Sequence, residues 1–153
     1  MKMERHHIDP RQELYLDLCS ALRGVPGVAH VDLWNENVVY IEEDIPYDMP
    51  AVFVEFGDIS WGTMKPSSGG VASRGEGSVI LHIVTNWHDG MQEGAWDLTA
   101  EIVDRLQGLG GSSYGALYQY HSQSCTNHNH EEILENIETF SCRYYRSYTL
   151  YNE

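Results

Sequence analysis

Basic residues, cysteines and long apolar runs are all scarce in this sequence. Nine Lys and Arg stand against 23 Asp and Glu, which gives a formal charge of −14 with the eight histidines neutral. Because phosphate contacts require a basic face, we expect neither specific nucleic-acid binding nor attachment to an anionic membrane. The longest apolar stretches, 51–54 and 79–84, are far shorter than the ~20 residues of a membrane-spanning helix. Residues 1–7 lead into no apolar segment of the kind found in secretory signals.

The three cysteines, Cys19, Cys125 and Cys142, are odd in number and widely spaced. A chain of 153 residues can bury about 70% of its unfolded surface, so it does not depend on disulfides to fold. We therefore expect reduced thiols and a cytosolic site of folding. Hydrophobic residues make up 42% of the chain and charged residues 21%, which is typical of a globular domain.

Apolar periodicity predicts two helices. The first spans 9–23, with Asp9 as its cap and Pro10 in its first turn, and the second spans 91–107. Their predicted buried residues recur at helical spacing: Leu14, Leu18, Ala21 and Leu22 in the first, and Ala95, Leu98, Ile102, Leu106 and Leu109 in the second.

Alternating or β-rich segments predict the strands. These are 28–33, 38–41, 51–56, 78–87, 114–121 and 133–150. The Asn-rich residues 34–37 indicate a tight turn between the first two, and a polar turn separates the last two. Both faces of the strand at 78–87 are largely apolar, so we expect it to be covered on both sides. The last strand is interpreted either as an edge strand over its own helix or as a strand that pairs across subunits.

Residues 57–77 contain six glycines, one proline and four serines, a composition typical of a mobile loop or an extended hairpin arm. No repeat or linker divides the chain. The prediction is a single α+β domain over 1–153, with two helices packed on a mostly antiparallel sheet.

The strongest candidate for a metal site lies between the last two strands, in His121, Cys125, His128 and His130. All four side chains are competent zinc ligands. However, His128 and His130 point to opposite sides of an extended strand, and no second ligand pair stands at a finger-like spacing. A hydrogen-bonded turn or a subunit contact is therefore favoured, and no metal or other cofactor is expected.

The other candidate catalytic or binding motifs each lack a residue or element that their chemistry requires. The glycine spacing at 70–77 resembles a phosphate-binding loop, but Glu76 stands where a lysine is needed and a strand follows in place of a helix. Cys19 and Cys142 lie on apolar faces and are interpreted as core thiols, while Cys125 lacks an oxyanion-stabilising device. The acidic residues 42–44 and Asp48 lack the spacing of a calcium loop. We expect no enzyme and assign no catalytic residue.

Large apolar side chains occur in the glycine-rich segment, where they would be exposed in an isolated monomer. Trp61 and Met64 lie in the glycine-rich segment, so that either the segment folds back over the sheet or a partner buries it. Tyrosine and arginine are concentrated near the C-terminus, as in interface cores. The predicted interface residues are Trp61, Met64, Lys65, Arg74, Tyr145 and Tyr148.

The order of these elements resembles the tail terminator family of long-tailed phages. This group of tail-completion proteins includes the minor tail protein U and tail-to-head joining types, and the chain is most similar to versions in Bacteroidetes prophages. The resemblance rests on four features and covers most of the chain. They are the turn at 24–28 after the first helix, the segment Pro50–Phe56 before a long loop, the strand 77–87 leading into a helix that ends in residues 104–108, and a final strand pair enclosing 126–128.

The resemblance implies a structural protein of the virion tail, assembled in the bacterial cytoplasm. Its subunits would form a hexameric ring that caps the tail tube, ends elongation and joins the head–neck connector. The implied partners are other copies of the chain, the tube protein and the connector protein. Two alternatives stay open: a metal-binding or metal-dependent hydrolase domain built on His121, Cys125, His128 and His130, and a related neck or tube subunit.

Overall fold

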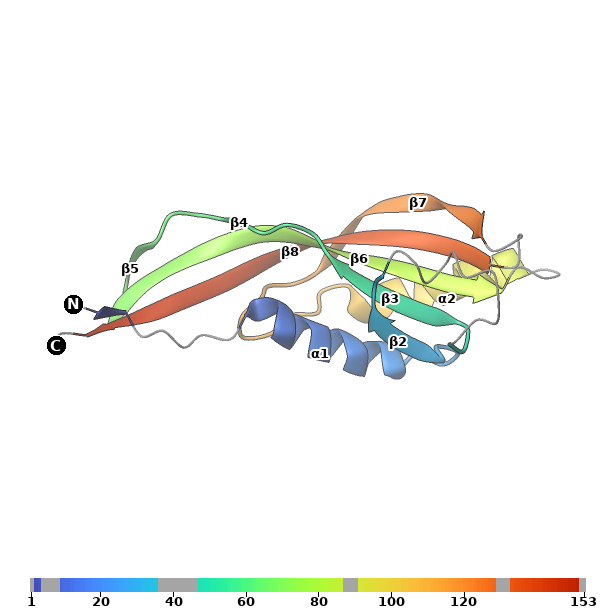
Figure 1. Ribbon diagram of the computed structural model, residues 1–153, viewed down its shortest axis with the longest axis horizontal. Helices are drawn as coiled ribbons and strands as arrows, with labels where there is room; N and C mark the ends of the chain where they lie inside the picture. The colour runs from blue at the N-terminus through green and yellow to red at the C-terminus, as the bar shows by residue number, and fades with distance from the viewer. Residues whose placement is uncertain (1, 4–8, 36–46, 87–90, 129–132, 152–153) are drawn as a thin grey trace.

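The computed structural model describes residues 2–3, 9–35, 47–86, 91–128 and 133–151. Its elements are two helices and one sheet system (Figure 1). In chain order they are β1 (Lys2–Met3), α1 (Pro10–Arg23), β2 (His30–Leu33), β3 (Ala51–Phe56), β4 (Ser60–Trp61), β5 (Lys65–Ser67), β6 (Gly70–Asn86), α2 (Met91–Leu106), β7 (Tyr118–His128) and β8 (Ile133–Tyr151). The predicted α+β class is confirmed.

Both helices begin and end close to the predicted residues. The Asp9 carboxylate caps α1 by accepting a hydrogen bond from the backbone N–H of Arg11 at 3.0 Å, and Pro10 occupies the first turn. Every residue predicted for the buried stripes is buried, except that Ala21 and Leu109 are only partly buried against the main core. The 3.6-residue period of apolar residues was sufficient to predict both helices and their buried residues, because each helix buries a single face.

The sheet is mostly antiparallel, with the order β1-β8-β6-β3-β2. β4 and β5 pair with β6, and β7 pairs with β8. The exception is β2, which runs parallel to β3. The sequence had suggested a hairpin between 28–33 and 38–41, but the second of these segments lies outside the described residues.

β6 and β8 form a long antiparallel ribbon that runs from Gly70 opposite Thr149 to Asn86 opposite Ile133. The expected start of this strand at Ser78 was wrong, because glycines carry no side chain and so hide the strand alternation. At Gly75 an added Cβ would lie 2.7 Å from both Ile59 and Trp61, and at Gly77 it would lie 2.9 Å from Tyr144. The glycines are therefore where neighbouring side chains pack onto the strand.

Over residues 133–141 the last strand is not an edge strand, whereas over residues 145–149 no described strand pairs with its second side. β8 pairs with β6 along nearly all its length, and β7 covers its other side over residues 133–141. β7 itself begins at Tyr118 and extends to His128, so residues 122–128 are strand and not the predicted polar turn. Tyr114 instead forms an isolated bridge with Tyr144. Local sequence could not reveal this pairing, which joins residues far apart in the chain.

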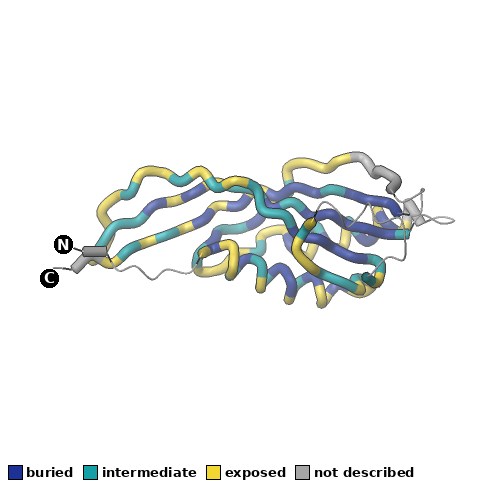
Figure 2. Tube along the Cα trace, viewed as in Figure 1, coloured by how far each residue is buried: buried dark blue, intermediate teal, exposed yellow. Residues whose placement is uncertain are grey.

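Two apolar clusters cover the two faces of the sheet. The larger one packs α1 and α2 against β3, β6 and β8, and the smaller one joins Ala51, Phe53, Val84 and Ile133 on the opposite face. The strand at 78–86 is thus covered on both sides, as predicted. Buried residues concentrate in this body, whereas the far end of the ribbon is mostly intermediate or exposed (Figure 2).

The far end of the ribbon projects from the body as an extended arm (Figure 1). We define the arm as residues 60–75, which contain β4, β5 and the start of β6, together with residues 143–149 of β8. Of the two forms expected for the glycine-rich segment, the structure has the hairpin arm. Its strands are held by the ladders of β4 and β5 on β6 and by the hydrogen bond from Gly62 N–H to the carbonyl of Arg74 at 2.7 Å.

Candidate functional site

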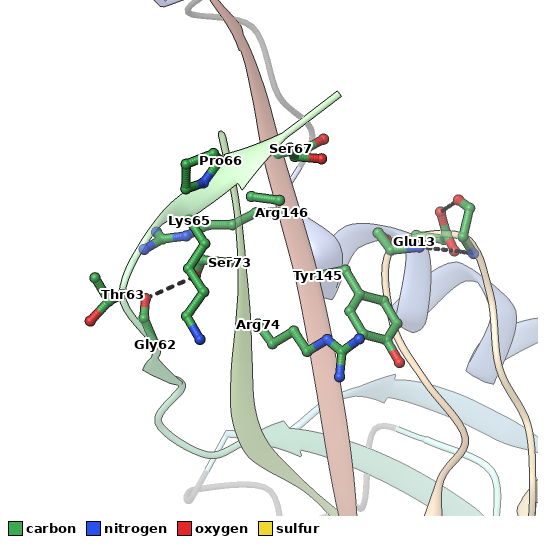
Figure 3. A pocket seen from close by; sticks show the side chains of 14 residues that line it. Glu13, Gly62, Thr63, Lys65, Pro66, Ser67, Ser73, Arg74, Tyr145 and Arg146 are labelled. Carbon is green, nitrogen blue, oxygen red and sulfur yellow. Dashed lines mark hydrogen bonds between the residues drawn. The ribbon is translucent and has the colours of Figure 1, made fainter. Parts of the chain in front are cut away.

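A groove of about 1040 Å³ runs along the arm where it meets the body (Figure 3). Three of the six predicted interface residues line it, namely Lys65 from β5, Arg74 from β6 and Tyr145 from β8. Arg146, which is not among the predicted interface residues, lines it as well. The remaining walls come from residues 62–63, 66–67, 72–73, 112–113 and 147 and from Glu13 at the start of α1.

Trp61 lies on the arm's own strands. Its ring is 6.4 Å from the Tyr144 ring between centroids, and the guanidinium carbon of Arg146 lies 4.1 Å from its centre. Trp61 also packs against the main core cluster. Of the two explanations for a tryptophan here, the structure thus provides the first, in which the segment folds back over the sheet.

The other two predicted interface residues do not line the groove. Met64 is half-buried in the link between β4 and β5, and Tyr148 is half-buried opposite Val71 in the ladder between β6 and β8. The structure therefore brings Lys65, Arg74 and Tyr145 together and leaves Trp61, Met64 and Tyr148 apart from them. Whether any of the six contacts a partner stays a prediction.

The arm is strongly basic in an acidic protein. It contains four of the chain's nine basic residues, Lys65, Arg74, Arg143 and Arg146, and none of its 23 acidic residues. Arg143 faces Glu76 at 3.7 Å, and Arg74 lies 6.0 Å from the centre of the Tyr145 ring. Among the residues that the structure describes, no carboxylate pairs with Lys65, Arg74 or Arg146. The groove therefore suits an acidic surface.

Glu13 fixes the wall of the groove on the side of the body. Its carboxylate accepts hydrogen bonds from the hydroxyl of Ser112 at 2.6 Å and from the backbone N–H groups of Ser112 and Ser113 at 2.7 and 3.2 Å. The hydroxyl and backbone donors lower the pKa of Glu13 by stabilising its charged form. The carboxylate thereby ties the loop at 112–113 to the first turn of α1.

The proposed metal ligands fall largely outside what the structure describes. His121 is exposed on β7. Cys125 and His128 belong to β7, of which the structure describes only the backbone at these two positions. His130 is outside the described residues altogether. In the described part of the chain, no three His, Cys, Asp or Glu side chains are grouped so that they could hold a metal ion.

Cys19 and Cys142 are buried free thiols, as predicted. Burial raises the pKa of Cys142 to about 11, which makes its reactive thiolate form scarce at neutral pH.

Sequence reasoning missed a buried polar cluster on the sheet face opposite the helices. His82 Nδ1 lies 2.7 Å from a Glu135 carboxylate oxygen, and its Nε2 lies 3.1 Å from one of Glu55. Trp34 stacks flat on the imidazole at 3.5 Å between ring centroids. The alternation of β6 placed His82 among apolar neighbours, and no local signal indicated partners on β3 and β8.

These features define a class: an elongated α+β protein with a helix-covered sheet and a basic β-arm. No family model matches the sequence, and no curated protein matches it either. Among solved structures, the chain is similar to a chain of the "Virion of native gene transfer agent (GTA) particle", with 13% identity and a TM-score of 0.54. The match covers 87% of this chain and 95% of that one, so it extends over nearly the whole fold of both. None of the described helices is long and apolar enough to cross a membrane.

Proposed function

We propose that this chain is a structural component of a phage-like particle, and that its role is to close the tail. The observation that carries the proposal is the likeness of fold to a chain of a gene transfer agent virion, which spans 87% of this chain and 95% of that one. The proposed role is that of a tail terminator. Copies of the chain form a ring, a hexamer in the family that it resembles, which caps the tail tube and joins the head–neck connector.

The arm supports a role in assembly. A β-arm that projects from the body and differs from it in charge is suited to a head-to-tail contact, in which two different surfaces of neighbouring copies meet. Such contacts close into rings when the rotation between copies is right. One face of the ring would then stack on the last layer of the tube and the other on the connector.

The proposed role requires surfaces and no catalytic residue. A formal charge of −14 is compatible with a ring through which DNA passes, because an acidic lumen does not retain phosphates. The ring would assemble in the bacterial cytoplasm and remain in the tail of the finished particle.

Light scattering on purified protein across a concentration series, followed by negative-stain images of the largest species, tests the proposal. Closed rings of one layer are the expected result. Long tubes would instead identify the chain as a tube subunit. A monomer at every concentration, both alone and with tail tubes added, would contradict the terminator role.

A further inference from the structure

We propose that the basic groove of the arm binds the acidic face of α2 on a second copy of this chain. The inference rests on the proposed ring and names the contact that closes it. It starts from the separation of charge between the arm, which has four basic residues and no acidic one, and a chain with a net charge of −14.

The arm presents free cations. Lys65 and Arg74 are exposed at the groove, and no carboxylate among the described residues pairs with either of them. Figure 3 shows both side chains extending into the groove from neighbouring strands. Glu13, the acidic residue that lines the groove, already accepts three hydrogen bonds from Ser112 and Ser113. The groove is thus left with uncompensated positive charge, which an acidic partner would neutralise.

α2 presents three exposed carboxylates along one face. Asp97, Glu101 and Asp104 lie at i, i+4 and i+7, so they share the face opposite the buried stripe of this helix. All three are exposed, and none has an ion-pair partner in the described part of the chain. By contrast, Glu13 and Asp17 on α1 are occupied, the latter by the Tyr114 hydroxyl at 2.6 Å. α2 is therefore the helix whose carboxylates are available.

The two surfaces cannot meet within one copy. The arm and α2 lie toward opposite ends of the elongated molecule (Figure 1). A contact between them joins different surfaces of neighbouring copies and leaves one arm and one helix free at the ends of any open chain of subunits. Such a contact is of the kind that closes rings.

Charge-reversal variants test the contact. The arm variant carries Lys65→Glu and Arg74→Glu, and the helix variant carries Glu101→Lys and Asp104→Lys. Arg146 is left unchanged because it stacks on Trp61 and helps to hold the arm. Each variant alone should need at least about tenfold more protein than the wild type for half-complete assembly, because like charges then face each other. Thermal unfolding of each variant checks that the subunit is still folded.

Two combinations distinguish a specific contact from a general charge effect. A single chain with all four substitutions should regain assembly, since the charges are exchanged. An equimolar mixture of the arm and helix variants should also assemble, with the two variants alternating, because the unchanged arm of one meets the unchanged helix of the other and the acidic arm meets the basic helix at the second contact. The control variant Arg23→Glu, at an exposed position on α1, should assemble as the wild type does.

Several outcomes would overturn the inference. If wild-type rings form and the arm and helix variants assemble equally well, the contact is wrong while the ring stands. The same conclusion follows if the arm variant loses duplex DNA binding with assembly unchanged, since the groove would then be a nucleic-acid site. A wild type that never assembles contradicts both the ring and the contact.

Discussion

The guanidinium carbon of Arg146 lies 4.1 Å from the centre of the Trp61 ring, and this contact ties two segments of the arm together. Trp61 belongs to β4, and Arg146 belongs to β8, while β6 runs between the two strands. A guanidinium over an indole is attracted by the ring electrons, and its planar shape adds packing area. The pair therefore holds the short β4 against the longer ribbon.

Replacing Trp61 should loosen the arm. We expect Trp61→Ala to lower the free energy of unfolding by about 2 kcal/mol, because a half-buried indole loses its contacts with Tyr144 and Arg146. Urea denaturation followed by circular dichroism measures this change. Trp96→Ala is the matched control, and since Trp96 is 53% exposed, it should change stability by less than about 0.5 kcal/mol. Equal effects of the two substitutions would contradict the packing of Trp61.

Gly75 should not tolerate a side chain. A Cβ at this position would lie 2.7 Å from Ile59 and Trp61, so Gly75→Ala should destabilise the protein by about 1–3 kcal/mol through overpacking. Gly94 in α2 has nothing within 4 Å of an added Cβ. Gly94→Ala should therefore stabilise the protein, by about 0.5–1 kcal/mol, because alanine favours the helix. Melting temperatures of the two variants should move in opposite directions, and a shift of both in the same direction would count against this account.

Removing the His82 side chain should be costly. It leaves the carboxylates of Glu55 and Glu135 without the group that lies between them, and Glu135 is only 4% exposed. We expect His82→Ala to destabilise the protein by about 3 kcal/mol or more, as measured by chemical denaturation. His121→Ala, at an exposed position on β7, should have little effect. Adding Glu135→Gln to the His82→Ala variant should recover part of the loss, since it removes one of the two charges; no recovery would argue against electrostatic repulsion as the cause.

The Cys142 thiol should resist modification and make stability fall at high pH. Burial raises its pKa from 9.0 to about 11 in the folded protein. Because the unfolded thiol ionises first, the stabilisation is complete below pH 9 and is lost as the pH rises toward 11. The variant Cys125→Ser, which retains the two buried thiols, should react with a disulfide reagent at pH 8 only as fast as it unfolds. Rapid labelling of one thiol in the folded variant would refute the burial.

The local pattern of residues was enough to predict the helices and strands that bury one face or that are stabilised by residues nearby in the sequence. Asp9 and Pro10 begin α1, the apolar spacing of α2 defines its buried stripe, and the β-rich segment Ala51–Phe56 is the buried strand β3. Alternation likewise predicted the long last strand, and Cys142 is a buried thiol on it, as expected. In each of these elements the signal repeats within a few residues, so no knowledge of the partner is needed.

The tertiary structure decided what depends on pairing across long distances in the chain. Gly70 belongs to a strand because β8 pairs with it, and β2 lies parallel to β3, a pairing that the local sequence does not indicate. His82 meets carboxylates from 27 and 53 residues away. The sequence alone determined that this protein is acidic and that four of its nine basic residues lie within the segments 65–74 and 143–146. Only the register between β6 and β8 brings those two segments together in the arm. The reason is physical: charge and periodicity are properties of each segment, whereas a site is formed by contacts between segments that the fold selects.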